Sequence, residues 1–382
     1  ISYSYCTSCR KQDKSNSWFK LFSFFHKNLP FLTTQSSYHI DEKIDNKKIF
    51  NVISLFSGCG GMDLGFRGNF NYLNKHYEKN PFNIVYANDI EAKAVQTYSY
   101  NFHHNAECLD IKNKNLDELP NADIVIGGFP CQDFSLSGKR KGLNSERGQL
   151  FKEMKAVIDK VKPLAFVAEN VDGIRSSKKT SDISALEYII SQFKNIGYNV
   201  VYKVMNAKYY GVPQNRVRVI IIGFRNDINN KIAFPKEKFS DEKNNFITSK
   251  QAIDDLWDKI NSTTILNHSD KDFSKAKFYP NKKTQGNIQI DPNKPAPTIR
   301  AEHHGNIEGH YRTYNDTDPQ NMLFWRRLSV RECARLQSFP DDFYFPCAAT
   351  YAYKQIGNAV PPVMAWFIAR AVYLKLTNNC RI

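Results

Sequence analysis

Short apolar runs recur between residues 50 and 223, and polar segments with helical spacing separate them. The runs are rich in Val, Ile and Phe and lie at 50–56, 84–87, 123–127, 164–168, 199–204 and 217–223. The segments EAKAVQTYSYNF and QLFKEMKAVIDKVK between them place apolar residues every three to four positions. Strands that alternate with helices predict βαβ units, so the expected fold class is α/β with a mostly parallel sheet.

The pattern changes on both sides of this region and predicts four parts. Residues 1–48 mix aromatic and basic residues without a clear period, and we expect an N-terminal extension of unknown role. Residues 49–224 form the α/β domain, and 225–345 a smaller, loop-rich domain that is poor in long apolar runs up to about residue 325. Residues 346–382 contain PPVMAWFIARAVYLKL, whose spacing predicts a helix that returns to the first domain.

Composition describes a folded, basic chain. Hydrophobic residues make up 41% of its 382 residues, and 53 Lys and Arg against 38 Asp and Glu leave a net charge of +15, which favours a polyanionic partner such as nucleic acid. We expect no membrane segment, because no run reaches the length of a spanning helix. The eight scattered cysteines indicate reduced thiols and a cytoplasmic protein. Cys6 and Cys9 form a lone CxxC, which we interpret as two ordinary thiols with no metal.

Glycines and acids follow the first predicted strands. In ISLFSGCGGMDLGF a strand leads into Gly58, Gly60 and Gly61, and a tight turn at this end of an open α/β sheet is where nucleotides bind. The next strand ends in Asp89, an acid suited to ribose hydroxyls. Asp110 could accept a hydrogen bond from an adenine amine. Together these residues predict an adenosyl cofactor.

A second set of polar residues follows later strands: Cys131, Glu169, Asn170, Arg216 and Arg218. Pro130 fixes the backbone at a strand end, so the thiol after it is expected to point into the crevice. The two arginines stand at period two, which predicts that both project from one face of a strand. A thiol, a carboxylic acid and two guanidiniums at one edge of a sheet favour attack on a polar ring.

Six motifs stand in one order along the chain: FSGCGG, GGFPCQDFS, ENV, QNRVRV, RRLSVRECARLQSFPDDF and QIGNAVPP. Over residues 50–223 and about 325–375 the chain thereby resembles the C5-cytosine DNA methyltransferase family of the restriction–modification type. The resemblance implies a Rossmann-like fold, S-adenosylmethionine as cofactor and double-stranded DNA as substrate. It also implies that residues 49–224 are the catalytic and cofactor-binding domain and 225–345 the target-recognition domain. A separate cognate restriction endonuclease and a monomeric state are further expectations.

The resemblance also implies roles for single residues. Cys131 would add to C6 of a flipped-out cytosine, Glu169 would act near N3 with Asn170 positioning it, and Arg218 with Arg216 would contact O2 or a phosphate. Removal of the C5 proton would need a base that the sequence does not identify. The expected cofactor contacts are Phe56, Gly58, Gly60, Gly61, Asp89, Ile90, Asp110, Pro130 and Asn358. Ile90 stands where the family often has an aromatic residue that stacks on adenine.

Two further stretches are expected to contact DNA. The basic segment after the thiol, SGKRKGLNSERGQLF, supplies Ser137, Lys139, Arg140, Lys141 and Arg147. In PAPTIRAEHHGNIEGHYR, Thr298 and Ile299 resemble a Thr-Leu pair that the family uses near the DNA backbone. The candidates for contacts there are Thr298, Arg300, His303 and His304.

Two alternatives remain open at this point. A tRNA cytosine methyltransferase would use the same chemistry, although the related family carries Pro in place of Phe129. A catalytically silent DNA-binding regulator is the second alternative, and the intact set of Cys131, Glu169 and Arg218 argues against it. The sequence does not reveal the DNA sequence that would be recognised.

Overall fold

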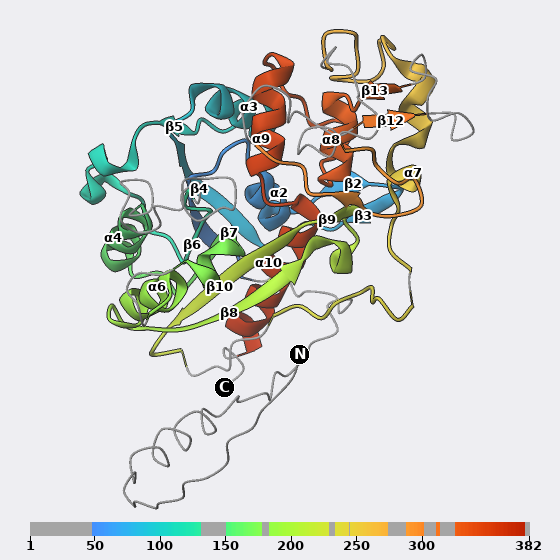
Figure 1. Cartoon of the computed structure of the whole chain (residues 1–382). Coiled ribbons are helices and arrows are strands. Elements are labelled where there is room, and N and C mark those ends of the chain that lie inside the picture. Colours follow the sequence, from blue (N-terminus) through green and yellow to red (C-terminus); the bar gives the residue numbers. More distant parts are fainter. Residues whose placement is uncertain are drawn as a thin grey trace, which may run out of the picture. The chain divides into compact units, whose positions relative to one another are not determined.

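All six predicted apolar runs are strands of one seven-stranded sheet (Figure 1). These strands are β1 (Phe50–Leu55), β4 (Phe82–Asp89), β6 (Ile124–Gly127), β7 (Ala165–Val171), β8 (Tyr198–Asn206) and β10 (Val217–Arg225), with β5 (Glu107–Cys108) at one edge. The order is β5-β4-β1-β6-β7-β10-β8. Neighbours from β5 to β7 run parallel, and β10 runs antiparallel to β7 and β8. The predicted α/β class with a mostly parallel sheet is confirmed.

The computed structural model describes residues 48–130, 150–177, 183–228, 234–243, 245–273, 288–301, 311–313 and 325–378. The chain divides into two compact units, 1–36 and 37–382, and every described residue belongs to the second. The predicted N-terminal extension therefore lies outside the described residues, apart from Lys48.

Helices cover both faces of the sheet. Side chains such as Val52 and Ile124 pack on one face against α2 (Gly61–Arg67) and α10 (Pro362–Asn378). Side chains such as Ile53 and Val125 pack on the other against α4 (Phe151–Val161) and α6 (Ala185–Lys194). Because successive residues of a strand point to opposite faces, a strand covered on both sides needs an unbroken apolar run. This requirement explains why these strands could be read from the sequence.

Two predicted helices between the strands are also confirmed. They are α3 (Ala92–Phe102) and α4. The remaining elements are shorter, and the hairpin of β2 and β3 was not predicted. These elements are β2 (Phe70–Tyr72), β3 (Lys75–Tyr77), η1 (Ile111–Asn113), η2 (Leu116–Glu118), α5 (Gly173–Ser176), η5 (Ala207–Tyr210), β9 (Gln214–Asn215), α7 (Ser249–Ile253), η6 (Asp254–Lys259), β11 (Ala296–Pro297), β12 (Tyr311–Thr313), β13 (Trp325–Arg327), α8 (Val330–Leu336) and α9 (Ala349–Asn358).

The region after β10 contributes to the same core as the sheet. Buried Leu256, Ile299 and Leu328 belong to one hydrophobic cluster with Phe50 of β1. The boundary between the two expected domains stays a prediction. The predicted C-terminal helix is confirmed as α10. It packs against α2 almost backbone to backbone, because a Cβ on Gly65 of α2 would lie 2.4 Å from the Ala365 Cβ.

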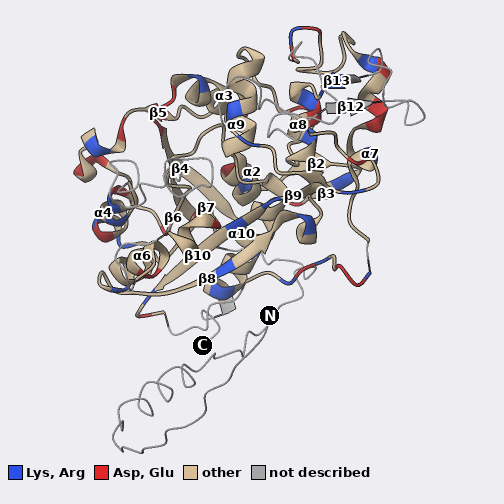
Figure 2. Cartoon of the chain, viewed as in Figure 1, with Lys and Arg blue, Asp and Glu red and all other residues tan. Residues whose placement is uncertain are grey.

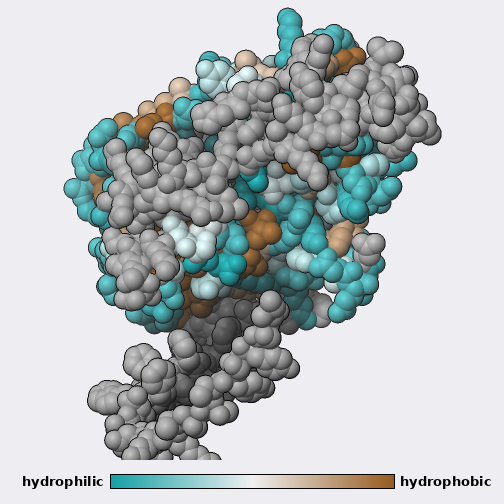
Figure 3. Space-filling view, viewed as in Figure 1, coloured by the Kyte–Doolittle hydropathy of each residue, from teal (hydrophilic) through white to brown (hydrophobic). Residues whose placement is uncertain are grey.

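One described stretch, Ala349–Thr377, is long and apolar enough to cross a membrane, but 94% of its most apolar window is buried inside the protein. On the face drawn in Figure 3, the described surface is mostly hydrophilic and its hydrophobic residues form small groups. Figure 2 shows basic and acidic residues interspersed over the described elements.

Candidate active site

The sheet brings the predicted site residues to one edge. β1 lies between β4 and β6: the chain continues from β1 to β4 and β5 on one side and then crosses to β6 on the other side. In an open α/β sheet, ligands bind outside the carboxyl ends of the strands at such a switch point. The segments that follow β1, β4 and β6 and the end of β7 all lie at this edge, because these strands are parallel.

The glycine turn after β1 depends on left-handed backbone conformations. Gly58 has φ of +56° and Gly60 has φ of +90°, and even Phe56 has φ of +52°. A Cβ on Gly60 would lie 2.3 Å from the Phe102 ring, so α3 closes that side of the turn. A Cβ on Gly58 would meet nothing within 4 Å, so open space borders the turn there. This space is where the expected cofactor requires room.

Asp89 at the end of β4 is held against this turn. Its carboxylate accepts hydrogen bonds from the backbone N–H of Gly58 at 2.8 Å and of Glu91 at 2.9 Å. Burial raises the pKa of Asp89, while the two backbone hydrogen bonds act in the opposite direction. The neighbouring Ile90 is 64% exposed. An acid beside an exposed aliphatic residue and an open glycine turn fits an adenosyl group.

Two other expected cofactor residues border the same region. Asp110 caps the N-terminus of η1, and its Oδ1 accepts from the Lys112 N–H at 3.1 Å. The Leu109 N–H donates to the Asp89 carbonyl at 3.2 Å, which brings the two acids' segments together. Asn358 ends α9 and is exposed. The roles of Asp110 and Asn358 stay predictions.

The link between α9 and α10 lies directly on the glycine turn. A Cβ on Gly61 would be 2.5 Å from the Val360 carbonyl oxygen and 3.0 Å from the Ala359 Cβ. The turn after β1 and the QIGNAVPP motif, about 300 residues later in the chain, are therefore in contact.

Glu169 and Arg218 meet at the same edge. The Arg218 Nε lies 2.8 Å from the Glu169 Oε1, and the two side chains are 12% and 10% exposed. The antiparallel direction of β10 causes this contact, because Arg218 at its start is paired with Val171 at the end of β7. The two groups form a nearly buried ion pair, although the Glu169 Oε1 has no hydrogen-bond partner of regular geometry among the described residues. The structure brings these two predicted site residues together, and their roles stay predictions.

Asn170 fixes the segment that leads to the thiol. It is fully buried, its Nδ2 donates to the Phe129 carbonyl at 3.2 Å, and its Oδ1 accepts from the Val171 N–H at 2.9 Å. A Cβ on Gly128 would lie 3.2 Å from the Glu169 Oε2, so the chain after β6 runs along the acid. Pro130 follows at the end of this segment. Cys131 itself lies outside the described residues.

Arg216 is fully buried, and its predicted contact with cytosine or a phosphate stays a prediction. It lies between β9 and β10, where its N–H donates to the Gln214 carbonyl at 3.0 Å and the strand is interrupted. Arg216 therefore lies just outside the continuous strand β10, which begins at Val217 and contains Arg218. The Arg216 side chain is 1% exposed and donates to the carbonyls of Ile299, Gly357 and Ala359 at 2.9–3.1 Å.

The expected DNA contacts are only partly described. The Thr298 hydroxyl donates to the Asn215 carbonyl at 2.7 Å, and β11 pairs with β9 just before it, so this segment lies beside the start of β10. Arg300 is half-buried in the same segment. The other candidates lie outside the described residues: Ser137, Lys139, Arg140, Lys141, Arg147, His303 and His304.

Two buried glutamines near the site were not assigned a role from the sequence. The Gln214 Nε2 donates to the Gln337 Oε1 at 2.5 Å and to the Leu336 carbonyl at 3.1 Å, and both glutamines are fully buried. They belong to the motifs QNRVRV and RRLSVRECARLQSFPDDF, yet a single glutamine carries no periodic signal. The only sequence signal for Gln214 and Gln337 was therefore their place in these motifs.

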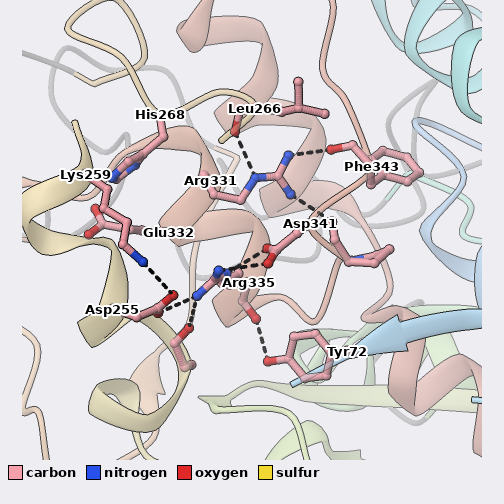
Figure 4. Close-up of polar contacts among 12 residues, drawn as sticks. Tyr72, Asp255, Lys259, Leu266, His268, Arg331, Glu332, Arg335, Asp341 and Phe343 are labelled. Atoms are coloured by element: carbon pink, nitrogen blue, oxygen red, sulfur yellow. Dashed lines mark hydrogen bonds and ion pairs between the residues drawn. The ribbon is translucent and has the colours of Figure 1, made fainter. Parts of the chain in front are cut away.

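Helix α8 anchors the loop-rich region through arginines (Figure 4). Arg331 is fully buried, and donates to the carbonyls of Leu266, Pro340 and Phe343 at 2.6–2.9 Å. Burial lowers the pKa of Arg331 to about 10. Arg335 pairs with Asp341 at 2.7 Å and with Asp255 at 2.5 Å. These contacts hold residues 255–266 against α8.

Among the described residues, no group of three or more His, Cys, Asp or Glu side chains is arranged to hold a metal ion.

Comparison with known proteins agrees with this geometry. The sequence profile of the family described as C-5 cytosine-specific DNA methylase matches residues 50–373. The Type II methyltransferase M.NgoFVII of Neisseria gonorrhoeae is 34% identical over 348 residues, which cover 86% of this chain and 87% of the relative. M.FnuDI of Fusobacterium nucleatum, also a Type II methyltransferase, is 34% identical over 357 residues, with 87% and 96% covered.

The fold has solved counterparts. The Schizosaccharomyces pombe Dnmt2 methyltransferase superposes with a TM-score of 0.61 at 20% identity, and the match covers 87% of this chain and 99% of that one. The chain belongs to the C-5 cytosine-specific DNA methylase family. It is a DNA (cytosine-5) methyltransferase, and S-adenosylmethionine is its methyl donor.

Proposed function

We propose that this methyltransferase acts on a cytosine flipped out of a short duplex sequence, through a covalent bond between Cys131 and C6. The observation that carries the proposal is the Glu169–Arg218 contact of 2.8 Å, beside the segment that Asn170 holds at the end of β6. A carboxyl group, a guanidinium and the segment leading to a thiol meet at one sheet edge. These are the groups that addition to a cytosine ring requires.

The reaction follows from the electronic character of cytosine. Carbon C5 is a weak nucleophile, and addition of the Cys131 thiolate to C6 converts the ring into an enamine whose C5 is nucleophilic. Glu169 delivers a proton toward N3 as negative charge develops there, and Arg218 keeps the acid oriented and stabilises the charge at O2. Bound S-adenosylmethionine supplies an electrophilic methyl group. Loss of the C5 proton to a base then restores the double bond and expels the thiolate.

The cofactor is held by the residues around the glycine turn. Asp89 would accept from a ribose hydroxyl pair, Ile90 would pack on the adenine face, and Asp110 would accept from the adenine amine. The backbone of Phe56, Gly58, Gly60 and Gly61 lines the other side. Pro130 and Asn358 complete the pocket, as their places beside β6 and at the end of α9 allow. The open space at Gly58 supports this arrangement.

Access to C5 requires base flipping, because both faces of the ring must be reached at C5 and C6. The basic segment with Ser137, Lys139, Arg140, Lys141 and Arg147 would contact phosphates, and Thr298, Arg300, His303 and His304 would lie against the duplex. Residues 225–345 would then choose the target sequence.

We further propose that the enzyme works as a monomer in the cytoplasm, separately from a cognate restriction endonuclease. The support comes from the +15 net charge, from the cysteines, which are scattered apart from Cys6 and Cys9, and from the Type II names of the relatives.

The test is methyl transfer from labelled S-adenosylmethionine to duplex DNA, to single-stranded DNA and to tRNA. We expect label in duplex DNA only, and Cys131→Ser should transfer none. Bisulfite sequencing of DNA from cells that express the gene then identifies the methylated sequence. If label appeared in tRNA and not in duplex DNA, the proposed substrate would be wrong. Full activity of Cys131→Ser would overturn the mechanism.

A further inference from the structure

Three buried polar side chains, Gln214, Arg216 and Gln337, form a group that we call the polar joint. Four chain segments meet there: residues 214–216, 299, 337 and 357–359. None of the three side chains is more than 1% exposed. Buried polar groups of this kind are costly unless every one is hydrogen-bonded, so their partners reveal what they hold together.

The Arg216 guanidinium holds segments from two sides of the site. Its Nη1 donates to the Ile299 carbonyl at 3.1 Å, and its Nη2 donates to the carbonyls of Gly357 at 2.9 Å and Ala359 at 3.0 Å. Ile299 stands between the expected DNA-contacting residues Thr298 and Arg300. Gly357 and Ala359 flank Asn358, an expected cofactor contact.

The two glutamines close the network. The Gln214 Oε1 accepts from the Ile299 N–H at 3.1 Å, and the Gln214 Nε2 donates to the Gln337 Oε1 at 2.5 Å. The Gln337 Nε2 in turn donates to the Ala359 carbonyl at 2.5 Å. Each of the two outer segments is thus bound at two points, and Ile299 has both its N–H and its carbonyl engaged.

A separate observation shows that these segments also touch directly. A Cβ on Gly357 would lie 2.5 Å from the Arg300 carbonyl carbon and 2.5 Å from the Ala301 nitrogen. Both contacts are with backbone atoms, which cannot rotate away as a side chain could. The end of α9 and residues 300–301 are therefore packed backbone against backbone.

We propose that Arg216 is a positioning residue that couples the cofactor side of the site, residues 357–359, to its DNA-facing side, residues 298–301. The guanidinium is planar and rigid, so its three carbonyl partners keep a fixed mutual geometry. Cofactor contacts that order Asn358 also order Thr298 and Arg300. DNA contacts that order Thr298 and Arg300 likewise order Asn358. Arg218, two residues along the same chain, is placed relative to both. The inference rests on the proposed function.

The experiment measures a coupling factor, the ratio of duplex affinities with and without S-adenosylhomocysteine. The duplex carries the sequence found by bisulfite sequencing, and anisotropy of a fluorescein label reports its binding. Calorimetry of S-adenosylhomocysteine with and without the duplex must give the same factor, because coupling is reciprocal. For the unmodified enzyme we expect roughly a five- to 150-fold effect, the usual range of such coupling.

Two variants disturb the joint in different ways. Arg216→Lys keeps the charge but loses the planar fork, so one ammonium cannot hold all three carbonyls. Gly357→Ala keeps Arg216 and forces residues 300–301 away from α9. We expect both variants to reduce the coupling factor to below about twofold. Gly357→Ala carries the test if Arg216→Lys fails to fold.

Arg331→Lys is the matched control, since Arg331 is also a buried arginine on three carbonyls, and none of these belongs to residues 298–301 or 357–359. It should lower the melting temperature and keep the full coupling factor. The inference is overturned if the unmodified enzyme binds both ligands without coupling, if Arg216→Lys or Gly357→Ala retains the coupling, or if Arg331→Lys loses it equally. Failure of the unmodified enzyme to bind either ligand would instead refute the proposed function.

Discussion

Asp63 is a buried acid directly behind the glycine turn, and it should make stability depend on pH. It lies in the first turn of α2 and is fully buried, and its Oδ1 accepts from the Tyr98 hydroxyl at 3.1 Å. Its Oδ2 has no hydrogen-bond partner among the described residues. Burial raises the pKa of Asp63 from 3.8 to about 6, against the opposing effect of hydrogen bonds from Ser54 and Tyr98.

The sign follows from proton counting. Between pH 3.8 and about 6 the folded protein holds a proton on Asp63 that the unfolded chain has lost. Stability therefore falls as pH rises through this window, and the full cost of the charged form applies above it. A pKa difference of about two corresponds to about 3 kcal/mol, of which roughly 2 kcal/mol develops between pH 4.5 and 7.5.

Asp63→Asn removes this titration. The amide stays neutral at every pH. The free energy of unfolding of the variant minus that of the unmodified protein should therefore increase by roughly 2 kcal/mol from pH 4.5 to 7.5. Any constant offset, such as an unmet amide hydrogen bond, cancels in this comparison. Urea unfolding of both proteins at several pH values measures the difference. Tyr98→Phe is the companion variant: it keeps the acid but removes a hydrogen bond to its charged form, so the falling limb should extend to higher pH. A difference between the Asp63→Asn and unmodified proteins that stays constant across this range would show that Asp63 titrates as an ordinary acid.

Further predictions concern the turn, the cofactor face and the substrate. Gly60→Ala should lower the free energy of unfolding in urea by about 2–5 kcal/mol, because it adds left-handed strain and a contact of 2.3 Å with Phe102. Gly197→Ala is the control: its φ is +96° but its Cβ would lie in open space, so it should cost only about 1–2 kcal/mol. Equal losses would exclude the clash. Ile90→Ala should weaken S-adenosylhomocysteine binding by up to about tenfold in calorimetry and leave the melting temperature unchanged, and an unaltered affinity would remove Ile90 from the pocket. Duplex binding should weaken with salt, with a slope of about −0.9 in log K against log salt for each phosphate contact, and a flat response in anisotropy would contradict a duplex substrate.

The strands and the position of the site could be predicted because both depend on local patterns. β6 and β7 are covered on both faces, so their sequences had to be continuously apolar. The carboxyl ends of parallel strands meet at one edge, so Asp89 and Glu169 could be assigned to a shared crevice without knowing a single contact.

The polar joint could not be predicted in this way. Arg216 and Arg331 have the same letters as surface arginines, and their burial depends on carbonyls from distant segments such as 266 and 357–359. The strand is interrupted at Arg216, between β9 and β10, and a period of two cannot reveal such a break. Buried arginines such as Arg216 and Arg331 contribute to the net charge of +15 but do not lie at the surface. The net charge therefore overstates the number of basic groups that can contact DNA.

The covalent step of the proposed mechanism can be observed directly. Duplex DNA with 5-fluorocytosine at the target, incubated with S-adenosylmethionine, should trap the enzyme after methyl transfer, because fluorine cannot leave C5 as a cation and the thiolate cannot then be expelled. We expect an adduct that survives denaturing electrophoresis, maps to Cys131 by peptide mass, is absent in Cys131→Ser and forms much more slowly in Glu169→Gln. An enzyme that methylates ordinary duplex at a normal rate but leaves no adduct, or an adduct on Cys59, Cys108 or Cys333, would contradict the mechanism.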